Sequence, residues 1–179
     1  QVPGILEASH FWLMGLHDYY LHSGDSITVA SLLENAERCA NALLDLQIKD
    51  NLITKPPHPF WIDWAKLAQG EQNFIINALQ ALAFRDYSQL LYWMGRKNEA
   101  LKWKTESQKI SKALSRFWVE KTGLFADNLN NGIPDENYSE HANALAIVAE
   151  TANNNQKKSI IKEITKNQFS EKLEEAVLF

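Results

Sequence analysis

Residues 9–25 read SHFWLMGLHDYYLHSGD, and this stretch indicates the architecture of the whole chain. Apolar and aromatic residues occupy most of the circumference of a helix over residues 9–22, which is typical of a helix buried on several sides. Gly24 follows as a helix stop, since glycine readily takes the left-handed conformation that ends many helices. The sequence therefore predicts that the chain opens with a buried inner helix.

The same pattern recurs along the chain as pairs of helices. Residues 27–46, which Asp25 or Ser26 can cap, carry a one-sided apolar stripe and should lie on the outside. Two further pairs, each with an apolar first helix and an amphipathic second one, are predicted at residues 73–94 and 97–117, and at 141–150 and 156–165. The fold class is therefore all-α: an incomplete (α/α)6 barrel of about three helical hairpins, with the first helix of each pair more buried than its partner.

Two long connections separate these pairs. Residues 47–60 contain the Pro-rich stretch 55–59 and cannot be helical throughout, because proline interrupts a helix. The segment after Trp118 is rich in Gly, Asn, Asp and Pro, which favours turns and a short extended piece. Long loops at one end of a helical barrel are expected to form a ligand cleft.

Composition excludes several classes of partner. The 179 residues carry a net charge of -4 with scattered Lys and Arg, which argues against a nucleic-acid surface. No apolar run reaches the roughly 20 residues that span a membrane.

The lone Cys39 lies in a helical apolar stripe and is expected to be a buried thiol. The chain is interpreted as one segment, 1–179, of a catalytic domain truncated at both ends, which could self-associate through exposed apolar flanks.

A first candidate site is the sequence Trp61-Ile62-Asp63-Trp64. Indole rings stack on the apolar faces of sugars, and a carboxylate accepts hydrogen bonds from sugar hydroxyls. The alternative is that Trp61 and Trp64 are core residues and that Asp63 is a helix N-cap.

A second candidate is the start of the helix at 141–150. Ser139, Glu140, His141 and Asn143 place an N-cap, an acid, an imidazole and an amide at a helix N-terminus, which can bind hydroxyls or anions. Simple capping and solvated polar residues are the alternative.

Other polar residues near the first helix give weaker signals. His17 and His22 diverge by about 140° around a helix, at about 100° per residue, so they do not form a metal site. No metal or other cofactor is expected. Glu7, Trp12 and Asp18 could line a cleft or could only pack and cap.

Six segments match, in order, the motifs of one known enzyme family. They are residues 10–25 ("W", "DYY", "TGD"), 60–64 ("F-x-DW"), 77–79 ("NAL"), Gly95 with 99–100 ("LG...EA"), 117–118 with 123–127 ("FW...GLYxD"), and 139–146 ("SQHANALA"). Together they resemble bacterial α-L-rhamnosidases, glycoside hydrolase family 78 and its six-hairpin relatives. The sequence departs from the pattern at Glu140, where the family usually has Gln, and at Ile62, where many members have Gly.

This resemblance implies an inverting hydrolysis of terminal α-L-rhamnose by a carboxylic acid and a carboxylate base. In the family the acid lies upstream of the Trp12 segment and the base lies downstream of the helix that begins near Ser170, so no catalytic residue is expected here. The isolated chain should be inactive. By motif match, the expected sugar contacts are Trp12, Asp63, Trp64 and His141, with Glu140 less securely placed.

The alternative from another class is a helical-repeat interaction module, because residues 90–95 followed by Ala100 resemble a tetratricopeptide helix pair. Such arrays repeat every 34 residues with short turns. A shift of 34 residues from Gly95 reaches Trp61 or Leu129, where no matching glycine is present. The sequence therefore favours the glycosidase interpretation.

Overall fold

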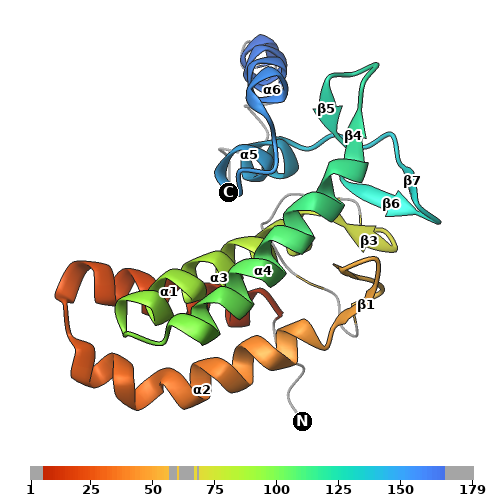
Figure 1. The fold of residues 1–179 in the computed structure, drawn as a ribbon. Helices are drawn as coiled ribbons and strands as arrows, with labels where there is room; N and C mark the ends of the chain where they lie inside the picture. Colours follow the sequence, from red (N-terminus) through yellow and green to blue (C-terminus); the bar gives the residue numbers. More distant parts are fainter. Residues whose placement is uncertain (1–5, 57–59, 61–66, 68, 168–179) are drawn as a thin grey trace, which may run out of the picture.

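The computed structural model describes residues 6–56, 60, 67 and 69–167, which form six helices and short strands (Figure 1). The helices lie within two residues of the predicted bounds at most ends; the largest shift is in the first helix, which starts three residues earlier than predicted. They are α1 (Leu6–Ser23), α2 (Ser26–Leu44), α3 (Phe74–Trp93), α4 (Lys97–Leu114, continued by a 3-10 turn at Ser115–Phe117), α5 (Glu140–Val148) and α6 (Asn154–Asn167).

Helices α1 and α3 run parallel. Near their starts, His10 Nε2 lies 3.4 Å from Gln80 Oε1, and further along both helices the ring of His17 stacks on that of Trp93. The contacts thus advance in the same direction on both helices. This is the relation expected of neighbouring inner helices of an α/α barrel.

Helix α5 runs parallel to α3 on its other side. At the starts of the two helices, Phe74 N–H donates to the Asp127 carbonyl, and the Asp127 side chain binds Ser139. At the end of α5, the Val148 carbonyl accepts a hydrogen bond from Arg85 of α3. The three predicted inner helices therefore begin at the same end of the molecule.

The helix that follows each of the first two inner helices runs back along it. On α4, Ser88 of α3 binds the carbonyl of Ala100, and Ser107 binds that of Ala81. Helix α2 starts at the Gly24 turn and passes α1 with Cys39 Sγ 3.8 Å from the Ser9 carbonyl. Cys39 is half-buried, and partial burial raises the pKa of its thiol.

Burial confirms two of the three expected inner helices, α3 and α5, and contradicts the third, α1. Most residues of α3 are buried, whereas α4 buries a single stripe. Helix α5 also has more buried residues than α6. The prediction that α1 is buried on several sides is wrong, because Phe11 and Leu21 are 52% and 55% exposed. Its apolar circumference buries only the face toward α2 and α3, and the remaining apolar residues face outward.

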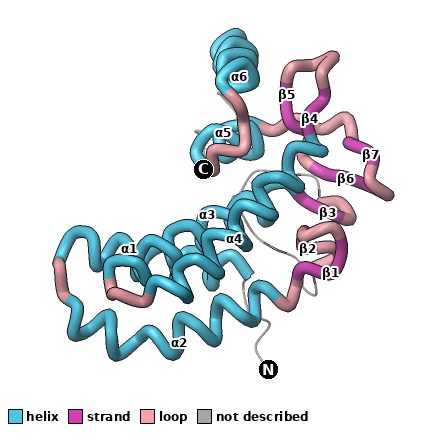
Figure 2. Tube along the Cα trace, viewed as in Figure 1, coloured by secondary structure: helices cyan, strands magenta, loops and turns pink. Residues whose placement is uncertain are grey.

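The strands form three small antiparallel sheets in the two long connections. They pair as β1 (Gln47–Lys49) with β2 (Leu52–Ile53), β4 (Trp118–Val119) with β5 (Leu124–Phe125), and β3 (Gln72–Asn73) with β6 (Asn128–Asn130), which also pairs with β7 (Ile133–Pro134). Figure 2 shows the strands gathered at the end of the α1–α4 bundle where α3 begins. The β3–β6 pairing joins the two long connections, so the loops do gather at one end.

Local capping signals agree with the sequence. The Asp25 carboxylate accepts the N–H groups of Ile27 and Thr28, and the Ser139 hydroxyl accepts that of Ala142. These side chains satisfy backbone donors that a helix start leaves unpaired. In the described part of the chain, no helix is both long and apolar enough to cross a membrane.

Candidate functional site

The start of α3 is held by a network of amide side chains. Asn73 caps the helix by accepting the N–H groups of Ile75 and Ile76, and its amide donates to Asn128 Oδ1 at 2.9 Å. The Asn128 amide donates in turn to Asp135 Oδ2 at 2.9 Å. Asn73 and Asn128 are both almost fully buried. The network therefore fixes α3 against the β6–β7 hairpin.

Asp127 connects this network to the start of α5. Its side chain is 3% exposed, and Oδ1 accepts hydrogen bonds from the Ser139 N–H at 2.8 Å and the Ser139 hydroxyl at 2.7 Å. Its backbone carbonyl accepts the Phe74 N–H. Hydrogen bonds to an ionised carboxylate are stronger than neutral ones. One residue thus positions the first turns of two inner helices.

Glu140 and His141 lie in the first turn of α5, with Glu140 exposed and His141 half-buried. The positive dipole end of this turn favours hydroxyl or anionic ligands. Asn143 is different from the expected solvated residue, because it is 1% exposed and exchanges hydrogen bonds with the backbone of Phe125. Its role is to hold α5 against β5.

The remaining predicted contacts lie elsewhere or outside the described residues. Trp12 lies on α1 and is 38% exposed, so its indole is accessible to a ligand. Asp63 and Trp64 fall outside the part of the chain that the structure describes. Glu140 and His141 lie in one helical turn. A pocket that they share with Trp12, Asp63 and Trp64 stays a prediction.

The sequence analysis named Glu7 as a residue that could line a cleft or only pack, but it did not predict that Glu7 and His10 are both buried on α1. Glu7 and His10, one turn apart, are 1% and 0% exposed. Burial lowers the pKa of His10 to about 4, because a charged imidazolium is poorly solvated there. Gln80, which contacts His10, also donates to the Leu43 carbonyl of α2. The signal in the sequence was the spacing of Glu7 and His10 with Leu13 on one helical face.

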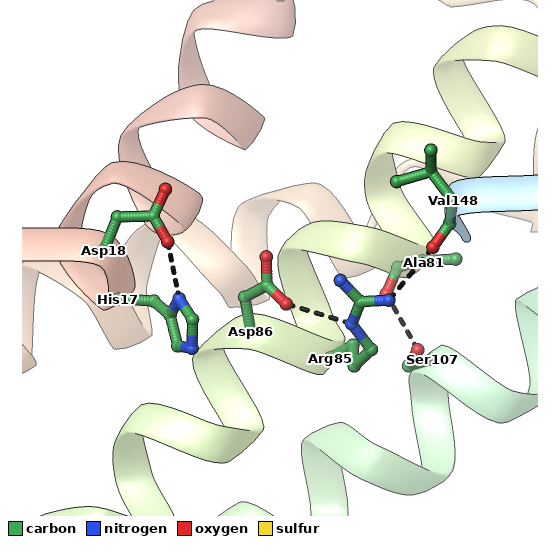
Figure 3. Close-up of polar contacts among 7 residues, drawn as sticks. All are labelled: His17, Asp18, Ala81, Arg85, Asp86, Ser107 and Val148. Atoms are coloured by element: carbon green, nitrogen blue, oxygen red, sulfur yellow. Dashed lines mark hydrogen bonds and ion pairs between the residues drawn. The ribbon is translucent and has the colours of Figure 1, made fainter. Parts of the chain in front are cut away.

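Polar side chains on the inner helices also make contacts beyond the first turns (Figure 3). His17 Nδ1 lies 2.8 Å from Asp18 Oδ1, so Asp18 interacts with its neighbour on the helix. Arg85 pairs with Asp86 at 3.0 Å and also donates to the Val148 carbonyl at the end of α5. A cation is favourable at a helix C-terminus. The hydrogen bond from Arg85 to the Val148 carbonyl thus links α3 to the end of α5.

Among the residues that the structure describes, no group of three or more His, Cys, Asp or Glu side chains could hold a metal ion.

A comparison with protein-family models assigns the chain to a family. The model of glycoside hydrolase family 100, the alkaline and neutral invertases, matches residues 14–173. The chain belongs to this family. No curated protein sequence matches it. The sequence motifs did not predict a match to the invertases. The invertases are themselves a glycosidase family of the six-hairpin type.

Solved structures of rhamnosidases share the fold. A family 78 rhamnosidase of Bacillus sp. GL1 superposes with a TM-score of 0.81 at 19% identity, over 90% of this chain and 18% of that one. A rhamnosidase from Klebsiella oxytoca with rhamnose bound gives 0.79 at 17% identity, over 93% of this chain and 31% of that one. The chain thus spans less than a third of either enzyme. The predicted resemblance and the hairpin-barrel fold class are confirmed.

Proposed function

We propose that this chain is part of the catalytic barrel of an inverting glycoside hydrolase that cleaves terminal α-L-rhamnose. The observation that carries the proposal is the set of hydrogen bonds that Asp127 accepts from Phe74 and Ser139, called the Asp127 clasp below. It holds the first turns of α3 and α5 together at the end where the loops gather. Glu140 and His141 lie in that turn of α5. A rigid support of this kind keeps ligand-binding side chains in a productive geometry.

The chemistry assigned to the chain is sugar binding. His141 and Asp63 would exchange hydrogen bonds with hydroxyl groups, and Trp12 and Trp64 would offer faces for stacking. Glu140 would add a carboxylate acceptor where the rhamnosidase motif has an amide. The acid and base of an inverting enzyme stand about 6.5 to 9.5 Å apart, with a water between them. We assign both to parts of the protein outside this chain.

A second candidate substrate is sucrose. It is supported by the match to the alkaline and neutral invertase family over residues 14–173. The six motifs that resemble rhamnosidases, including the stretch at residues 139–146, favour the rhamnoside. Both candidates require a glycosidase site at the same end of the barrel, so they differ in the sugar and not in the position of the site. A helical-repeat interaction module is disfavoured by the hydrolase family match.

The proposal is tested by hydrolysis assays on the complete protein with an aryl α-L-rhamnoside and with sucrose. We expect turnover of the rhamnoside, and His141→Ala should weaken rhamnose binding by removing a hydrogen bond worth about 1 kcal/mol. Lys104→Ala, on the exposed face of α4, is the matched control. Turnover of sucrose alone would replace the rhamnoside assignment, and hydrolysis of neither would contradict the proposal. The 179-residue chain by itself should hydrolyse neither substrate.

A further inference from the structure

A groove of about 520 Å³ lies between the β4–β5 hairpin and the segment that leads from β7 to α5. One wall comes from the hairpin and the other from the segment before α5. The side chains that matter for its chemistry are Val119, Lys121, Pro134, Glu136 and Tyr138. Figure 1 shows both walls at the same corner of the molecule, beyond the end of α4.

Two of the residues that line the groove already make hydrogen bonds within the fold. Asp135, which also lines it, accepts hydrogen bonds from the amide groups of Asn128 and Asn137 at 2.9 and 2.8 Å. Thr122 donates to the Val119 carbonyl within the hairpin. These contacts keep the two walls in place, and they leave other side chains to meet a ligand.

Three other lining residues have side chains that are available to bind a ligand. Lys121 and Glu136 are exposed, Tyr138 is half-buried, and none of them makes a hydrogen bond or ion pair with the residues that the structure describes. Together they offer a cationic donor, an anionic acceptor and an aromatic ring with a hydroxyl. Val119 and Pro134 add apolar surface.

This combination suits a neutral polyol better than an ion. Opposite charges on Lys121 and Glu136 do not select a strongly charged ligand, whereas separate donors and acceptors beside an aromatic face match the hydroxyls and C–H face of a sugar. The volume lies within the roughly 300 to 1,000 Å³ range of small-molecule sites. Tyr138 is two residues before Glu140, so their Cα atoms are at most about 7 Å apart.

We propose that this groove binds the second sugar residue of the substrate, the one joined to the sugar held at the start of α5. The assignment rests on the proposed glycosidase function. It makes Tyr138 the stacking platform, with Lys121 and Glu136 as hydrogen-bonding partners of the sugar hydroxyls.

The test measures saccharide binding to the complete protein by calorimetry. The probes are L-rhamnose, methyl glucoside, and a rhamnosyl-glucose disaccharide whose linking oxygen is replaced by sulfur, so that it is not hydrolysed. The wild type should bind the disaccharide more tightly than rhamnose. Tyr138→Ala should weaken disaccharide binding about tenfold, the effect of losing roughly one stacking contact, and should leave rhamnose binding unchanged.

Tyr138→Phe keeps the ring and should retain most of the tighter binding, which separates stacking from a general loss of fold. Lys104→Ala is the matched control for Lys121→Ala, because Lys104 is exposed on α4 away from the groove. Disaccharide binding that is unaffected by Tyr138→Ala, or equal losses for disaccharide and rhamnose, would overturn the groove assignment. Tyr138-dependent binding of methyl glucoside without any rhamnose binding would retain the groove and contradict the rhamnosidase proposal.

Discussion

The carboxylate of Asp127 accepts two hydrogen bonds from Ser139, one from its N–H at 2.8 Å and one from its hydroxyl at 2.7 Å. Ser139 is the N-cap of α5, and the Asp127 carbonyl accepts the first N–H of α3. A contact between two residues twelve positions apart thus sets the relative position of two helix starts.

Replacement of Asp127 by Ala should loosen the start of α5. The Ser139 N–H and hydroxyl would lose a charged partner, at a cost of about 2 kcal/mol. Hydrogen exchange of the first-turn amides of α5 should become faster, while amides in the middle of α4 should change little. Asp45→Ala removes an exposed carboxylate at the end of α2 and is the control. Equal exchange rates at α5 in both variants would contradict the positioning role of Asp127.

Gly70 and Gly15 should respond in opposite ways to alanine. A Cβ at Gly70 would lie 2.6 Å from Asn128 Cβ, and the Gly70 N–H donates to Asn128 Oδ1. Because backbone must move, Gly70→Ala should cost about 1 to 3 kcal/mol of unfolding free energy. Gly15 lies inside α1 with open space around it, so Gly15→Ala should stabilise by about 0.5 to 1 kcal/mol. Chemical denaturation measures both, and a stabilising Gly70→Ala would contradict the tight packing of Asn128.

His10 should make stability depend on pH below neutrality. Its pKa is about 4 in the folded chain and about 6.5 when unfolded, so the unfolded state binds the proton first as pH falls. The buried neutral ring of His10 therefore contributes fully to the free energy of unfolding above pH 6.5. This contribution, on the order of 3 kcal/mol in total, is lost as the pH falls from 6.5 to 4.

His10→Gln cannot titrate and should flatten this part of the stability curve, as measured by denaturation at several pH values. His22→Gln makes the same substitution at an exposed position at the end of α1 and is the matched control. A wild-type curve as flat as that of His10→Gln would show that His10 is not buried as a neutral ring.

The helical framework could be predicted from the sequence because burial imposes a 3.6-residue period. Ser139 was recognisable as a cap from its position just before an apolar run, and the sequence offered Asp25 or Ser26 for the second helix, of which Asp25 is the cap. The exposure of Phe11 on α1 could not be predicted, since an apolar side chain does not indicate whether a neighbour covers it.

The candidate site was only partly predictable. The position of Glu140 and His141 in a helix first turn followed from the local sequence. The clasp between Asp127 and Ser139 depends on a long-range arrangement of turns, for which the sequence carries no periodic signal. The groove beside Tyr138 arises in the same way, from two loops brought together by strand pairing.

Exposed apolar side chains should cause the 179-residue chain to self-associate. Phe11, Leu21 and Tyr92 are 52%, 55% and 57% exposed, and exposed apolar surface favours association. We expect dimers or larger species in sedimentation velocity, and the double variant Phe11→Ser/Leu21→Ser should shift the distribution toward monomer. Substitution of Thr105 by Ser, on the exposed side of α4, is a neutral control. A monomeric wild-type chain at high concentration would contradict this prediction.

The central claim, an inverting hydrolase acting on α-L-rhamnosides, is tested most directly by the anomeric configuration of the first product. Proton NMR of the complete protein with an α-L-rhamnoside should show β-L-rhamnose first, because water attacks the face opposite the leaving group. The α anomer should then appear slowly by mutarotation. α-L-Rhamnose as the first product, or no hydrolysis of the rhamnoside, would contradict the account.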